Sequence, residues 1–318
     1  EEAAALTGTV VETERNGRTY LYERLRIGDK LRDRYIGEAT PDLRDRIARQ
    51  KKLRAAARDR RETRARLVRI LRAEGYFTLP APIGSILYAF EKTGVFRLGG
   101  TLVGTVAFLI YEGELGIRLG RLDLAQTGDI DIASFERLSI ALNDRVDEDT
   151  ARTLAELDFA PVPSIDGHKV WRWTQTKRET MVEFLTPAFG DEGIRDLPAL
   201  GVSAQALHYL NFLLRSPIKA AALYRSGVLV QIPAPERFAI HKLIVADRRR
   251  EGPDALKARK DRAQAAILIE ALAEERPDDL LEAWEEARAE GPRWRERMDR
   301  TLTRMPAAAD ILTGLGAG

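Results

Sequence analysis

The segment from Thr127 to Ala133 (TGDIDIA) alternates aspartate with isoleucine, a pattern typical of a half-buried β-strand. Neighbouring residues of a strand point to opposite faces of a sheet, so Asp129 and Asp131 would lie together on one face. Ile130 and Ile132 would enter the core from the other face. Because adjacent carboxylates repel each other, the pattern indicates either a bound cation or an edge strand whose aspartates are solvated.

A glycine-rich turn precedes this segment and favours a bound cation over a solvated edge strand. The short apolar run Val95–Leu98 predicts a strand, Gly99 to Thr101 a turn, and the apolar residues up to Tyr111 a helix. Backbone N–H groups at a helix start can bind phosphate, and Thr101 adds a hydroxyl. Mg²⁺, or Mn²⁺ in its place, is commonly held by one or two carboxylates and substrate phosphates. The glycines could instead serve only to pack strand against helix.

The glycine-rich turn, the apolar run and the aspartate strand together resemble the motif of a known family. Leu98-Gly99-Gly100-Thr101, then Gly104, Ala107 and Tyr111, then Thr127 to Ala133, resemble the core motif of the DNA polymerase beta-like nucleotidyltransferase superfamily. The resemblance is closest to an uncharacterised bacterial branch. In that superfamily a Gly-Gly or Gly-Ser turn at a helix start holds the triphosphate, and acids on two strands bind metal. The resemblance therefore implies that Gly99, Gly100 and Thr101 hold the phosphates of an NTP and that Asp129 and Asp131 bind Mg²⁺.

Two further site residues are expected from the same resemblance. Glu183, in the strand-like run Met181–Pro187, is the candidate third acid, although aspartate is more usual there. A hairpin formed with the preceding run 170–173 would bring Glu183 beside the strand that carries Asp129 and Asp131. Lys242, in the run Pro233–Leu243 that is predicted to start a helix, is a candidate phosphate contact, with a surface lysine as the alternative.

The N-terminal part of the chain has a different character. Residues 8–37 predict a small β unit, in which Asn16-Gly17 is a strong hairpin signal. Thr40 and Pro41 then suit the start of a long helix, and residues 41–75 hold 13 Lys or Arg against 5 Asp or Glu. This basic helix could bind the phosphates of RNA. It could equally be a solvated helix, or one through which two copies of the chain associate into a homo-oligomer.

Composition sets broad limits. A chain of 318 residues with 44% hydrophobic content can form two or three domains. The absence of cysteine excludes disulfides, thiolate zinc sites and a cysteine nucleophile. The apolar runs of the chain are too short to span a bilayer, so no membrane partner is expected. The composition fits a cytoplasmic protein.

We therefore expect an α+β protein, with a nucleotidyltransferase-fold core of mixed sheet and helices. The expected divisions are a β-hairpin and basic-helix module (1–78), the core (79–232) and a helical C-terminal region (233–318). Within these, residues 217–224 are predicted to be helical and the tail after Met305 to be mobile.

The expected activity is the Mg²⁺-dependent transfer of a nucleoside monophosphate (NMP) from an NTP to an acceptor hydroxyl. Asp129, Asp131 and Glu183 would be the catalytic and metal-binding acids, and the basic helix suggests RNA or tRNA as the acceptor. The alternative is a non-catalytic nucleotide- or RNA-binding protein, such as a toxin–antitoxin partner that retains the fold.

Overall fold

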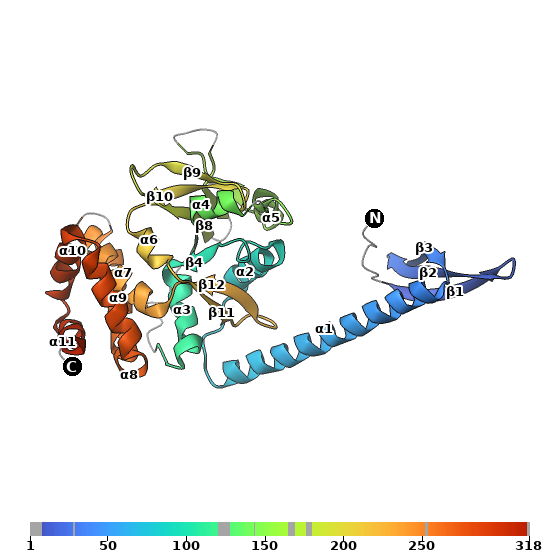
Figure 1. Cartoon of the computed structure of the whole chain (residues 1–318), viewed down its shortest axis with the longest axis horizontal. Coiled ribbons are helices and arrows are strands. Elements are labelled where there is room, and N and C mark those ends of the chain that lie inside the picture. The colour runs from blue at the N-terminus through green and yellow to red at the C-terminus, as the bar shows by residue number, and fades with distance from the viewer. Residues whose placement is uncertain are drawn as a thin grey trace. The chain divides into compact units, whose positions relative to one another are not determined.

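The computed structural model of the chain forms two compact units, residues 1–67 and 68–318 (Figure 1). The residues that it describes are 8–27, 29–119, 128–142, 144–164, 169–175, 180–251 and 254–316. Each unit has its own apolar core, and the two cores differ greatly in size.

The first unit contains a three-stranded antiparallel sheet in the order β1 (Thr9–Arg15), β2 (Arg18–Ile27), β3 (Lys30–Glu38). Asn16 and Gly17 both have positive φ, at 52° and 72°, so the predicted Asn-Gly hairpin is confirmed. The small core is built around Leu21.

Helix α1 (Pro41–Ala73) begins and ends as the sequence predicts. The Leu43 N–H donates to Thr40 Oγ1 at 3.3 Å, which caps the first turn. At the other end, Gly75 has a φ of 83° and the Tyr76 N–H donates to the Leu71 carbonyl, an arrangement that satisfies the last carbonyls. Among the described residues of α1 only Ile47 is buried, so its many basic side chains lie at least partly in solvent.

The second unit is built on a mixed seven-stranded sheet. Its main order is β4 (Thr101–Val103), β5 (Asp129–Ala133), β8 (Thr180–Pro187), β10 (Val202–Leu207), β9 (Ile194–Leu197). Strand β7 (Arg172–Gln175) pairs with the first half of β8 and also with the short β6 (Ala160–Pro161). Strands β5 and β8 run parallel, whereas β4 is antiparallel to β5.

One face of this sheet carries the main core. Ile130 and Ile132 of β5 and the alternate residues Val182 and Phe184 of β8 are fully buried. Phe184 packs against Phe90 of α2 (Ala81–Thr93), with ring centroids 6.0 Å apart. This packing determines which side chains of β5 and β8 must point to the other face. The remaining helices of this part are α3 (Gly104–Leu115), α4 (Glu136–Ala141), α5 (Thr150–Glu156) and α6 (Leu210–Leu213).

Two sequence expectations are wrong in the last third of the chain. Residues 218–222 form strand β11 (Ile218–Ala222), paired with β12 (Val228–Ile232), instead of a helix, because their alternate side chains are buried in the hairpin. The tail after Met305 contains helix α11 (Pro306–Leu315), whose Ala308 and Leu312 are buried one turn apart. Its apolar spacing explains why it packs.

Four more helices precede α11. They are α7 (Pro235–Arg248), α8 (Ala255–Glu275), α9 (Pro277–Ala289) and α10 (Pro292–Leu302). Helix α7 contacts α8, α9 and α10, so it is the centre of this region (Figure 1). None of the helices in the described parts of the chain is both long enough and apolar enough to cross a membrane.

Candidate functional site

The glycine-containing turn next to the acids differs from the one that the sequence suggests. Residues 94–99 form consecutive turns, not a strand, and the Gly100 N–H donates to the Val95 carbonyl. The strand begins only at Thr101, and helix α3 begins at Gly104. Val95, Phe96 and Leu98 are buried in the core, whereas Arg97 is exposed, and hydrophobicity alone does not distinguish such a buried turn from a strand.

Gly104 lies directly against the carboxylate of Asp131. Its φ is +69°, and a Cβ at this position would be 2.2 Å from Asp131 Oδ2. The antiparallel pairing of β4 with β5, in which Val103 lies opposite Asp131, produces this approach. The first turn of α3, starting with Gly104 and the half-buried Thr105, therefore presents its unpaired N–H groups beside the acids. A glycine and a hydroxyl residue at the start of an apolar helical run were the sequence signal for it.

The three residues first expected at this position lie elsewhere. Thr101 pairs with Ala133, at the opposite end of β5 from Asp129, and Gln231 donates to its hydroxyl at 2.9 Å. A Cβ on Gly99 would be 2.8 Å from Leu138 Cδ2, and one on Gly100 would be 2.7 Å from the Val95 carbonyl oxygen. The structure does not bring Gly99, Gly100 and Thr101 to the acids, and the two glycines serve close packing.

The acids themselves come together as the strand pattern indicates. In the parallel β5–β8 pair, Asp131 lies opposite Glu183, and Asp129 precedes Asp131 on the same face. Burial, followed by the charges of Glu183 and Asp129, raises the pKa of Asp131 to about 7, against the opposing effect of Lys242 and Arg249. Asp131 is thus a buried carboxyl with two acids beside it.

Glu183 already has a basic partner. Arg172 lies opposite it in the β7–β8 pair, with its Nε 2.6 Å from Glu183 Oε1. The Arg172 guanidinium also lies over the ring of Trp171, 4.3 Å from its centroid. The result is a row of charged side chains, Arg172, Glu183 and Asp131, across three neighbouring strands.

Lys242 is close to the acids but is not exposed to solvent. Its Nζ lies 2.5 Å from Asp261 Oδ1, and Arg249 Nη1 lies 2.9 Å from Asp261 Oδ2. The neighbouring His241 is buried, and burial together with the Lys242 charge lowers its pKa to about 3, which keeps the imidazole neutral. The predicted phosphate contact at Lys242 would require this buried ion pair to open.

The carboxylates of this site are suited to a divalent cation in part. No group of three or more His, Asp or Glu in the described ranges is arranged to hold a metal ion. Mg²⁺, however, usually takes only one or two protein carboxylates and completes its shell with phosphate and water. Asp129 and Asp131 supply two such carboxylates on one face of β5. The aspartate pair fits the cation, whereas Glu183 is engaged by Arg172.

Replacing Gly104 by alanine should destabilise the protein by about 1–3 kcal/mol, because the new Cβ meets Asp131 and the backbone has positive φ. Gly113 of the same helix is the matched control. No atom lies within 4 Å of a Cβ built on it, so Gly113→Ala should stabilise by about 0.5–1 kcal/mol. Urea unfolding measures both changes. Equal effects of the two substitutions would contradict the contact between Gly104 and Asp131.

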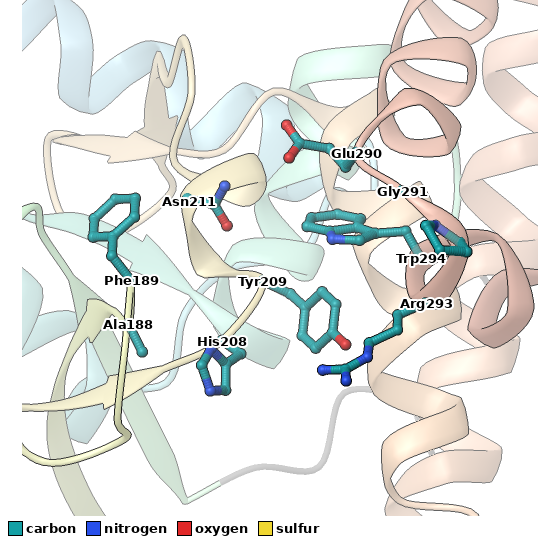
Figure 2. Close-up of a pocket in the computed structure, with 10 residues that line it drawn as sticks. Ala188, Phe189, His208, Tyr209, Asn211, Glu290, Gly291, Arg293 and Trp294 are labelled. Atoms are coloured by element: carbon teal, nitrogen blue, oxygen red, sulfur yellow. The ribbon is translucent and has the colours of Figure 1, made fainter.

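A hollow in the surface lies away from the acids (Figure 2). It has a volume of about 450 Å³ and is lined by residues that follow β8 and β10 and by the start of α10. Tyr209 has a φ of 72°, and its ring packs edge-on against Trp294 with centroids 4.8 Å apart. Figure 2 shows Phe189 on one side of the hollow and Trp294 on the other. Because Asp129, Asp131 and Glu183 do not line it, we do not assign the chemistry to this hollow.

Comparison with known proteins gives one match. A family model described as nucleotidyltransferase matches residues 81–289, more than half of the chain. The matched range contains the sheet, the acids and helices α7 to α9. No curated protein and no solved structure matches the chain.

Proposed function

We propose that this chain, which belongs to the nucleotidyltransferase family, transfers an NMP from an NTP to an acceptor hydroxyl. One observation carries the proposal, namely the contact of Gly104 with Asp131. It sets the N-terminus of helix α3, which suits phosphate, against two aspartates that suit a divalent cation. Neither a packing turn nor a solvated edge strand requires this juxtaposition.

The first turn of α3 and the two aspartates have different roles in this proposal. Backbone N–H groups of the first turn of α3 bind the β- and γ-phosphates, and Thr105 adds a hydroxyl. Asp129 and Asp131 hold Mg²⁺ or Mn²⁺, which would supply charge neutralisation on the phosphates. The first turn of α3 thus takes the role that the resemblance implied for Gly99, Gly100 and Thr101.

The transfer is a displacement at the α-phosphorus. The acceptor oxygen forms the new P–O bond, and the bond to the pyrophosphate oxygen breaks. Catalysis then rests on positioning the two oxygens and on stabilising the charge that develops between them. Glu183 could accept the proton of the acceptor hydroxyl only after its ion pair with Arg172 loosens.

RNA is the proposed acceptor. Helix α1 leaves its basic side chains at least partly in solvent, and residues 41–75 carry 13 basic against 5 acidic residues. Such a helix can neutralise phosphates, and its binding should weaken steeply with salt. The alternative is a non-catalytic nucleotide- or RNA-binding protein. The observation in its support is that Glu183 and Lys242 are both held in ion pairs.

Incubation with each labelled NTP, Mg²⁺ and total cellular RNA tests the proposal. Label should enter RNA with the intact protein and not with the Asp129→Ala/Asp131→Ala variant. Label entering protein or a small molecule would retain the activity and correct the acceptor. NTP binding without transfer in any fraction would contradict the catalytic proposal in favour of the binding alternative.

A further inference from the structure

A second cavity, of about 330 Å³, lies among helices α7, α8 and α10 and is lined largely by arginine. Arg250 follows the end of α7, Arg262 belongs to α8, Arg300 to α10, and Arg304 follows α10. Asp247 is the only acid among the described residues that line it. We call this hollow the arginine cavity.

The carboxylate of Asp247 is already fully used. Its side chain is only 1% exposed. It accepts hydrogen bonds from Arg250 at 2.8 Å, from Arg297 at 2.7 Å and from Arg300 at 3.1 Å. One negative charge thus serves three guanidinium groups. It cannot also neutralise the other arginines of the cavity.

Arg262 and Arg304 are those other arginines. Within the part of the chain that the structure describes, neither forms an ion pair with an acid. Burial, followed by the charges of the neighbouring Arg304 and Arg259, lowers the pKa of Arg262, and Asp261 opposes this effect. The planar guanidinium fork matches the oxygens of a phosphate, so such a cavity favours a phosphate group over a simple halide.

The arginine cavity shares helices α7 and α8 with the ion pair of Lys242 and Asp261, which lies beside the candidate active site. Helix α7 carries Lys242, whose charge acts on Asp131, and Asp247 lies five residues further along, about 7.5 Å along the helix axis. On α8, Asp261, the partner of Lys242, is followed directly by Arg262. The cavity and the ion pair next to the acids are thus parts of the same two helices.

We propose that the arginine cavity binds a phosphate group, and that in the proposed reaction this phosphate belongs to the acceptor. The role of this phosphate as part of the acceptor rests on the proposed function, whereas phosphate binding itself does not. The phosphate belongs either to an RNA backbone or to a phosphorylated small molecule.

Calorimetric titration of the full-length protein with three probes, without NTP, tests the binding. The probes are inorganic phosphate, a sugar phosphate and a short single-stranded RNA. The Arg262→Gln/Arg304→Gln variant should bind at least one probe ten or more times more weakly than the unaltered chain does. Because neither arginine forms an ion pair, the variant should keep its melting temperature. The control, Arg145→Gln/Arg152→Gln, removes two exposed arginines outside the cavity and should bind as the unaltered chain does.

A tenfold loss confined to RNA assigns the phosphate to a nucleic acid, and a loss confined to the sugar phosphate or inorganic phosphate assigns it to a small molecule. The proposal is overturned if the unaltered chain binds no probe, or if the variant and the control bind every probe alike. The Asp129→Ala/Asp131→Ala protein should still bind the probe. Binding without transfer would thus refute the proposed function alone, and transfer without binding would refute the arginine cavity alone.

Discussion

Asp131→Asn should lower nucleotidyl transfer at least about 100-fold while the protein remains folded. The amide keeps the shape of the side chain but removes the charge that, in the proposed function, would bind a cation beside the first turn of α3. Transfer of label from NTP measures the loss. An Asp131→Asn protein that keeps more than about a tenth of the activity would exclude Asp131 from the reaction.

The same substitution should stabilise the protein at alkaline pH. The pKa of Asp131 is raised to about 7 in the folded chain, so between its ordinary value and about 7 the folded state binds a proton that the unfolded state has lost. Stability contributed by this group therefore falls as the pH rises through that window. Asparagine does not titrate, and the melting temperature of the variant relative to the unaltered chain should rise from pH 5 to pH 8.

Glu183→Gln provides the comparison for the Asp131 result. Since Arg172 already neutralises Glu183, we expect this variant to keep at least about a tenth of the activity. A loss of about 100-fold would instead show that Glu183 leaves Arg172 during the reaction and acts as a general base or a metal ligand. The two variants together decide whether the site uses two acids or three.

Asp261→Ala should destabilise the second unit by about 3–5 kcal/mol, because it leaves Lys242 and Arg249 without their buried partner. The Asp261 side chain is 3% exposed. Burial alone would raise its pKa, but the two cations reverse this and lower it, as expected of a strongly paired carboxylate. All four tryptophans lie between residues 171 and 294, so their fluorescence during urea unfolding reports on this unit.

Two variants make the Asp261 result specific. Glu156→Ala breaks an exposed ion pair with Arg152 in the same unit and should cost less than about 1 kcal/mol. Asp261→Leu combined with Lys242→Met replaces the buried pair by apolar side chains and should recover much of the loss. If Asp261→Ala costs no more than Glu156→Ala, the buried ion pair does not stabilise this unit.

Local patterns predicted the strand that carries the acids and its neighbour. The alternation of Asp129 to Ala133 fixed which side chains share a face, and the run around Glu183 had the same period. The parallel pairing then placed Glu183 beside Asp131, as expected. Such predictions succeed because side-chain direction in a strand follows from the period of two alone.

Errors arose where distant contacts override local preference. Residues 218–222 (IKAAA) have high helix propensity, yet pairing with β12 makes them a strand. The mostly apolar run Val95–Leu98 looks like a strand but forms turns, and the helix that was expected directly after Thr101 begins at Gly104. The predicted hairpin did not give the register that sets Arg172 opposite Glu183, and no local pattern reveals that Asp247 of α7 meets Arg297 and Arg300 of α10.

The in-register pairing of β7, β8, β5 and β4 links folding fidelity to chemistry. A shift of β8 by one residue would turn Glu183 into the core and bring Val182 to the charged face, a cost that no folded form could sustain. A misaligned yet compact form of this protein is therefore not expected to accumulate. Inactive preparations should consist of unfolded or aggregated chains, and the specific activity of the folded fraction should stay constant from one preparation to the next.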